Sequence, residues 1–149
     1  MVAISFTSSA GDVEEARRIL AENGCPMPVI AKIETGAGVD AAMEIAHAAD
    51  MVMAGRGDLA LYMPWIELPG LVKQIAGAAR RTKTPWILAT QIAEGMEHFS
   101  IPTRAEICDI ARWLDDGCAA VMLSNETVFG RNAAGAIRST KELIDRWGR

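Results

Sequence analysis

Five short hydrophobic runs, separated by stretches with helical periodicity, limit what this chain can fold into more than any other feature. The runs contain almost no polar residues, which is typical of parallel strands covered on both faces. A repeated strand–helix unit of this kind predicts an α/β fold, with a parallel sheet and right-handed helical crossovers. The predicted strands are residues 2–6, 29–33, 51–54, 86–90 and 121–123.

The intervening stretches place hydrophobic residues three and four positions apart, which predicts helices. One stretch also carries a start signal, because Thr103 and Glu106 have the spacing of a capping box directly after Pro102. No linker or change of composition interrupts the pattern, so we predict one domain over residues 1–149. The predicted helices are residues 12–22, 39–49, 68–81, 103–114 and 132–147.

Composition excludes several classes of protein. Of the 149 residues, 50% are hydrophobic and 23% are charged, which indicates a globular chain rather than a disordered one. The formal net charge is -4 and no basic cluster occurs, so nucleic acid is not an expected partner. The hydrophobic runs are too short to span a membrane, and the first residues do not resemble a signal peptide. Three widely spaced cysteines without a CxxC motif fit a reducing, cytoplasmic location.

Polar residues gather where each predicted strand ends. In parallel α/β folds the chemistry lies at the carboxyl ends of the strands, so these residues are candidates for a shared site. The opposite strand ends are plainer. The polar strand ends are Thr7-Ser8-Ser9, Lys32 with Glu34, Arg56-Gly57-Asp58, Thr90-Gln91 and Ser124-Asn125-Glu126-Thr127.

Lys32 and Glu34 are two residues apart at the end of a predicted strand, so their side chains should point to the same side. Asp58 follows the next strand and could bring a second carboxylate to that rim. Two interpretations stay open. Two hard oxygen ligands beside an amine suit a divalent metal that holds an anionic oxy-acid. A salt bridge between Lys32 and one carboxylate would instead be purely structural.

Five segments carry a family resemblance: residues 29–34 (VIAKIE), 55–59 (GRGDL), 88–91 (LATQ), 102–106 (PTRAE) with Asp109, and 121–127 (VMLSNET). Together, in this order and spacing, they resemble the catalytic barrel of the pyruvate kinase family over nearly the whole chain. The resemblance implies that the chain supplies strands four to eight, the second half, of a TIM-type (β/α)8 barrel. It also implies that further phosphate and nucleotide contacts come from the first three strands, which this chain lacks.

The resemblance implies roles for individual residues. Glu34 and Asp58 match the family's two carboxylate ligands of Mg2+ or Mn2+. Lys32 matches the lysine beside the phosphoryl group and the enolate oxygen, where its charge would stabilise the transition state. Gly57 and Asp58 match positions whose backbone amides meet the substrate carboxylate at a helix start. Thr90 matches the hydroxyl residue implicated in the proton relay.

Other residues are expected to support the site or to depart from the family pattern. Ser124 and Glu126 are expected to hold the end of the last strand in place rather than to react, and Thr103 with Glu106 to cap a helix. The full supporting set is Arg56, Gln91, Ser124 and Glu126. Three departures are Gly55, where alanine is usual, and Ala60 and Asn125, where glycine is usual; those at Gly55 and Asn125 are expected to be mild.

Half a barrel leaves two open sheet edges and one uncovered hydrophobic face. We therefore expect a homodimer first, and otherwise a complementary half-barrel chain or an open, doubly wound sheet. Trp65, just after Pro64, is either an exposed contact for such a partner or a cap on the core. The inward residues that need cover are Ile4, Ile33, Met53, Leu88 and Met122.

Three functions from different classes follow. The first is a glycolytic, pyruvate-kinase-like phosphotransferase that binds a divalent metal and phosphoenolpyruvate or pyruvate, and that transfers phosphoryl to ADP once the barrel is completed. The second is a metal-dependent, enolate-forming lyase of the oxaloacetate decarboxylase or pyruvate aldolase type. The third is a non-catalytic, homo-oligomeric descendant of pyruvate kinase. Retention of Lys32, Glu34, Asp58 and Thr90 together counts against the third, and the family resemblance favours the first.

Overall fold

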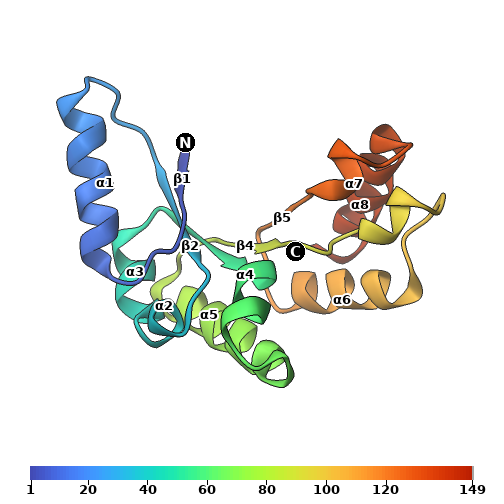
Figure 1. The fold of residues 1–149 in the computed structure, drawn as a ribbon, viewed down its shortest axis with the longest axis horizontal. Coiled ribbons are helices and arrows are strands. Elements are labelled where there is room, and N and C mark those ends of the chain that lie inside the picture. Colours follow the sequence, from blue (N-terminus) through green and yellow to red (C-terminus); the bar gives the residue numbers. More distant parts are fainter. Residues whose placement is uncertain (149) are drawn as a thin grey trace. The chain divides into compact units, whose positions relative to one another are not determined.

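The computed structural model describes residues 1–148 as an α/β fold (Figure 1). Five strands form one sheet in the order β1-β2-β3-β4-β5, and both β1–β2 and β2–β3 pair in parallel. The predicted fold class is confirmed: over the described residues the sheet is open, with β1 and β5 at its two ends. The strands are β1 (Val2–Ile4), β2 (Val29–Ile33), β3 (Met51–Gly55), β4 (Trp86–Ala89) and β5 (Ala120–Met122).

The chain divides into two compact units, Met1–Ile87 and Leu88–Arg149, which we call unit 1 and unit 2. The single domain over residues 1–149 stays a prediction. Unit 1 contains the helices α1 (Ala10–Glu22), α2 (Gly36–Asp40), α3 (Ala42–Ala48), α4 (Arg56–Tyr62) and α5 (Leu68–Thr82), and the 3-10 helix η1 (Trp65–Glu67). Unit 2 contains the 3-10 helix η2 (Glu94–Glu97) and the helices α6 (Arg104–Asp115), α7 (Asn125–Val128) and α8 (Ala133–Trp147).

In unit 1, α1, α3 and α5 pack in that order against one another and against β2 and β3 (Figure 1). The two strands are buried at all but one position each, as their uniformly hydrophobic sequences require. Their register sets Lys32 opposite Met53 and Ile33 opposite Ala54. The carboxyl ends of β2 and β3 are therefore adjacent, which places Glu34 close to the start of α4.

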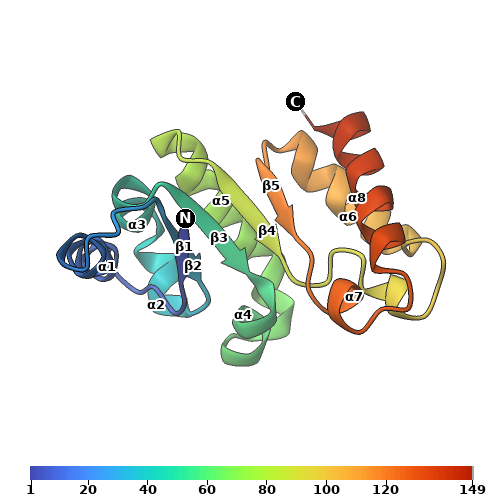
Figure 2. The same ribbon diagram turned by 90° about the horizontal axis from the view of Figure 1, so that it is seen from above.

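In unit 2, α8 packs against α6 and α7, and α7 packs against η2 (Figure 2). Its small core contains the buried residues Ala93, Met96 and Ala136, with Leu123 packed against them. Ala93 follows β4 and Leu123 follows β5. This core therefore joins the loops that leave the two strands.

The expected exposure of inward hydrophobic residues is confirmed only at the ends of the sheet. Ile4 on β1 and Met122 on β5 are partly exposed, because each end strand lacks a neighbour on one side. Ile33, Met53 and Leu88, on the three inner strands, are buried. Trp65 is 76% exposed within η1, so the alternative that it caps the core is wrong.

Three of the α-helices differ from prediction. Thr35 accepts a hydrogen bond from the backbone N–H of Gly38 and starts α2 earlier than expected; Ala41 then interrupts the predicted helix over 39–49. The short helices α4 and α7 were not predicted by the sequence pattern. The capping box at Thr103 and Glu106 is confirmed, since each backbone N–H bonds the other side chain. Across residues 1–148, no helix combines the length and hydrophobicity needed to cross a membrane.

Candidate active site

Lys32 and Glu34 form an ion pair at the carboxyl end of β2. The Lys32 Nζ lies 2.8 Å from Glu34 Oε1, because residues two apart in a strand share one side. Glu34 is 2% exposed and Lys32 is 24% exposed. The predicted strand-end salt bridge is therefore present, and it belongs to a larger cluster of polar groups.

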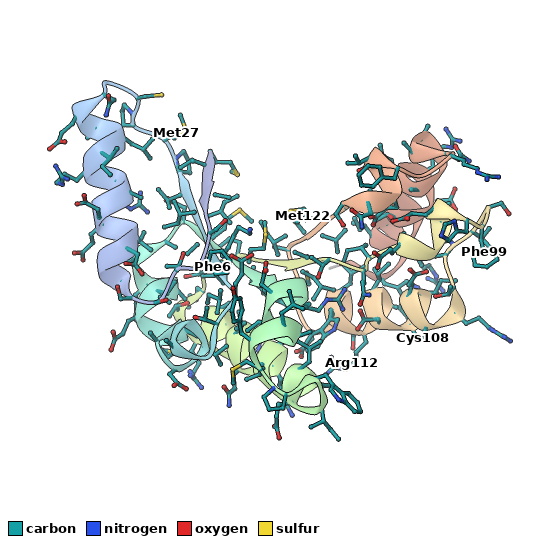
Figure 3. All side chains as sticks on the ribbon, viewed as in Figure 1. Phe6, Met27, Phe99, Cys108, Arg112 and Met122 are labelled. Atoms are coloured by element: carbon teal, nitrogen blue, oxygen red, sulfur yellow. The ribbon has the colours of Figure 1, made fainter. Side chains whose placement is uncertain are left out.

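Ser5 and Phe6, just after β1, complete the surroundings of this ion pair. The Phe6 backbone N–H donates to Glu34 Oε2 at 2.9 Å, and Lys32 Nζ donates to Ser5 Oγ at 3.1 Å. Phe6, which is labelled in Figure 3, has a φ of 54°, an uncommon conformation for a bulky residue. Its ring packs edge-on against Tyr62 of α4, 6.1 Å between centroids. The strained turn thus aims a backbone donor at the carboxylate.

Asp58 brings the second carboxylate to the cluster. Partial burial raises the pKa of Asp58 above its usual range, and the negative charge of Glu34 and a hydrogen bond with it add to this effect. Lys32 opposes the rise in that pKa through its positive charge. Glu34 therefore opposes the ionisation of Asp58, and a cation bound between the two carboxylates would favour it.

Gly57 and Asp58 lie in the first turn of α4, as the predicted role in substrate binding requires. Arg56 is the first residue of that helix, and Gly55 precedes it without a side-chain cap. Backbone N–H groups at a helix start are not bonded within the helix. The start of α4 therefore carries donors beside the carboxylates of the cluster.

The residues present fit a divalent cation in part. Glu34 and Asp58 supply hard oxygen ligands of the kind that Mg2+ and Mn2+ take. Within residues 1–148, no group of three or more His, Cys, Asp or Glu side chains could hold a metal ion. A cation held here would complete its coordination with water or with oxygen atoms of a substrate, as Mg2+ commonly does.

In unit 2, Thr90 and Gln91 follow β4 in an unusual backbone conformation. Their φ angles are 64° and 49°, and positive φ is a genuine outlier for a β-branched residue such as Thr90. The Thr90 hydroxyl donates to the Ala89 carbonyl at 2.7 Å. Strain of this kind persists only where surrounding structure enforces it, and it concentrates at functional sites.

Glu126 is fully buried in unit 2 and is held by neutral donors. Its Oε1 accepts from the Ala93 N–H at 3.1 Å, and its Oε2 accepts from the Ser124 N–H at 2.9 Å. The Ser124 hydroxyl lies 3.4 Å from the same oxygen. Glu126 therefore ties the loop after β4 to the loop after β5, in the way expected of a supporting residue.

The polar residues after β1 lie elsewhere than the shared-site hypothesis predicts. Ser9 caps α1 in a capping box with Asp12, and the Ser8 N–H donates to the same aspartate. Thr7 is buried and donates to the Ile4 carbonyl. The residues that do contact the cluster, Ser5 and Phe6, were missed. Ser5 was detectable from its place at the strand end, but a backbone donor such as that of Phe6 leaves no signal in the sequence.

In α/β barrels the active site lies at the carboxyl ends of the strands, which is where this chain places Lys32, Glu34 and Asp58. The family model "Pyruvate kinase, barrel domain" matches residues 1–137. The pyruvate kinase of Chlamydia trachomatis serovar D is 43% identical over 145 residues, which are 97% of this chain and 30% of that protein. The pyruvate kinase of Mycobacterium intracellulare is 40% identical over 144 residues, with the same two shares.

This chain belongs to the pyruvate kinase barrel domain family. It spans 30% of the length of the relatives it matches. The family membership and the partial α/β barrel follow from these matches and from the fold.

Proposed function

We propose that this chain is the second half of a pyruvate kinase barrel, strands four to eight, and that it binds a divalent cation together with phosphoenolpyruvate or pyruvate. The observation that supports this most is the cluster of Lys32, Glu34 and Asp58 within unit 1. An amine and two carboxylates in contact give the charges that an anionic oxy-acid and a cation need.

Each residue has a defined task in this proposal. Glu34 and Asp58 hold Mg2+ or Mn2+, which when bound supplies Lewis acidity to the substrate oxygens. Lys32 places its positive charge where an enolate oxygen or a transferring phosphoryl group develops negative charge. The first N–H groups of α4, at Gly57 and Asp58, bind the substrate carboxylate. The Thr90 hydroxyl takes part in the proton relay, and Gln91 is a supporting residue.

Phosphoryl transfer to ADP requires the rest of the barrel in this proposal. The exposed strands β1 and β5 offer edges for such completion. The partner is a second copy of this chain or a chain that carries the complementary half-barrel, and the complex works in the cytoplasm. Arg56, Ser124 and Glu126 support the site and do not react.

A second candidate is a metal-dependent lyase that forms an enolate, such as an oxaloacetate decarboxylase or a pyruvate aldolase. It is favoured by one observation: Lys32, Glu34 and Asp58 come together inside unit 1 alone. Enolate chemistry needs these groups and no nucleotide. A phosphoryl-transfer assay with ADP separates this candidate from the first.

Exchange of the pyruvate methyl protons with solvent tests the shared core of both candidates. Proton NMR in deuterated buffer with Mn2+ or Mg2+ should show exchange catalysed by the wild type and none by Lys32→Met. Lys73→Met, on the exposed face of α5, is the matched control and should exchange normally. Equal exchange by Lys32→Met and the wild type would contradict the role of Lys32.

A further inference from the structure

Gly55, the last residue of β3, lacks a side chain, and the space that a side chain would fill contains Glu34. A Cβ atom at Gly55 would lie 2.6 Å from Glu34 Cγ and 2.9 Å from its Oε1. Separations this short do not occur for real Cβ atoms, so one of the two residues would have to move. On α5, by contrast, a Cβ at Gly70 or Gly77 would meet no atom within 4 Å. The position of the Glu34 side chain therefore requires a glycine at residue 55.

We call the space bounded by Gly55, Lys32 and the Phe6 backbone the Gly55 niche. Inside it, the protein engages both oxygens of Glu34: Oε1 pairs with Lys32 Nζ at 2.8 Å, and Oε2 accepts from the Phe6 N–H at 2.9 Å. Only 2% of Glu34 is exposed. In the niche, the carboxylate is withdrawn from solvent and its charge is balanced internally.

A hydrated cation needs more space than the Glu34 carboxylate has around it in the Gly55 niche. Mg2+ gives up water reluctantly and usually keeps several water molecules when it binds to a protein. A carboxylate ligand therefore needs open space around the ion. Glu34 gains that space when its side chain turns out of the Gly55 niche and exchanges Lys32 for the cation. Asp58 is already partly exposed and need not move.

We propose that the Gly55 niche holds Glu34 in a retracted position that competes with divalent cation binding, so that Gly55 sets the affinity of the site. This rests on the proposed function, because it takes Glu34 as a cation ligand. Gly55 is a positioning residue, since it acts through Glu34 and touches neither the cation nor the substrate. A methyl group at position 55 fills the niche and leaves Glu34 only the outward position.

Gly55→Ala tests the proposal, with Gly77→Ala as the matched control that adds the same methyl group in open space. Calorimetric titration of Mn2+ should show about tenfold tighter binding by Gly55→Ala, as expected when a competing interaction of about 1.4 kcal/mol is lost. Gly77→Ala should bind like the wild type. Equal or weaker binding by Gly55→Ala would overturn the proposal.

A metal-free measurement separates this inference from the proposed function. The rate at which acetic anhydride modifies Lys32, followed by peptide mass spectrometry, should rise in Gly55→Ala, because Lys32 loses its partner, and stay unchanged in Gly77→Ala. An unchanged rate in Gly55→Ala would overturn the proposal that Gly55 holds Glu34 against Lys32, whatever the Mn2+ affinity of the variants. A raised rate without Mn2+ binding by any variant would instead reject the cation site, and with it the competition.

A second pair of variants covers the case in which Gly55→Ala does not fold. In Glu34→Ala the side chain that occupies the niche is gone, so adding Gly55→Ala to it should leave the free energy of unfolding unchanged. In the wild-type background the same change should lower that free energy, and the difference measures the coupling between the two residues. If Gly55→Ala alone does not fold, adding Glu34→Ala should restore folding. Equal destabilisation in both backgrounds would show that the niche does not depend on Glu34.

Discussion

Two buried glutamates in this chain differ in what surrounds them. Glu34 in unit 1 is 2% exposed and Glu126 in unit 2 is 0% exposed. Glu34 lies against Lys32 and Asp58, both of which carry charges. Glu126 accepts hydrogen bonds from the backbone of Ala93 and from Ser124, all neutral donors.

Burial alone therefore does not define a functional site. Neutral backbone donors satisfy a carboxylate fully and hold two loops together, which is a structural task. Around Glu34, by contrast, a charged lysine and a second carboxylate interact electrostatically, and a charged ligand can alter these interactions. Substitutions at and around the two glutamates should therefore affect stability and cation binding differently.

Glu126→Ala should lower the free energy of unfolding by about 3 kcal/mol, because it leaves the buried N–H of Ala93 and the partly buried N–H of Ser124 without acceptors. Urea unfolding measures this, with Glu142→Ala on the exposed surface of α8 as the control that should change little. If Glu126→Ala lost no more free energy of unfolding than the control, Glu126 would not stabilise the fold by linking the loops after β4 and β5.

Glu34→Gln should weaken Mn2+ binding by at least about tenfold, since removing even a group behind a metal ligand costs that much. The fold should stay intact. Glu126→Gln is the matched comparison and should leave Mn2+ affinity unchanged, because Glu126 holds loops and not the cation. If Glu126→Gln weakened the binding as much as Glu34→Gln, the distinction between the two glutamates would be lost.

Asp58 makes the cluster sensitive to pH. Its raised pKa means that the folded state binds a proton more readily than the unfolded chain, so ionisation of Asp58 costs stability as the pH rises through that pKa. Asp58→Asn should therefore raise the melting temperature at pH 7, and the gain should shrink as the pH falls through the raised pKa and be gone below the usual range for aspartate. Mn2+ binding by the wild type should weaken over the same fall in pH.

Melting curves at a series of pH values check this prediction. Asp40→Asn, an exposed aspartate at the end of α2, is the control. A lower melting temperature of Asp58→Asn at pH 7 would show that Glu34 does not repel Asp58.

Thr90→Gly should stabilise unit 2 by about 1 kcal/mol, because glycine relieves the cost of a positive φ at a β-branched residue. Gln91→Gly, at an unbranched residue with a similar φ, should gain less. Urea unfolding again gives the values. Destabilisation by Thr90→Gly would mean that contacts of the threonine side chain outweigh its backbone strain.

Hydrophobic pattern was enough to predict the strands and the longer helices, and a capping box marked the start of α6. Strands β1 to β5 agree with the predicted runs to within two residues at either end, because buried parallel strands have to be uniformly hydrophobic. The short helices α4 and α7 were missed, since neither is long enough to show a period. Ala41 interrupts the helix predicted over 39–49. Nothing in the sequence indicates this break, because no glycine or proline stands there.

The sequence predicted those parts of the site that consist of side chains at the ends of predicted strands. The two-residue spacing of Lys32 and Glu34 predicted their shared side, and the salt bridge confirms it. The contribution of Phe6 is a backbone N–H, which any residue could supply. The replacement at Gly55 was expected to be mild, yet Glu34 occupies the very space a side chain there would need, and only the packing reveals that.

The decisive experiment is calorimetric titration of Mn2+ into the purified chain, with and without oxalate as a mimic of the pyruvate enolate. The cluster of Lys32, Glu34 and Asp58 predicts Mn2+ binding that strengthens when oxalate is present and that weakens at least about tenfold in Glu34→Gln. Absence of binding under both conditions, with the chain folded, would contradict the claim that these residues form a cation and substrate site.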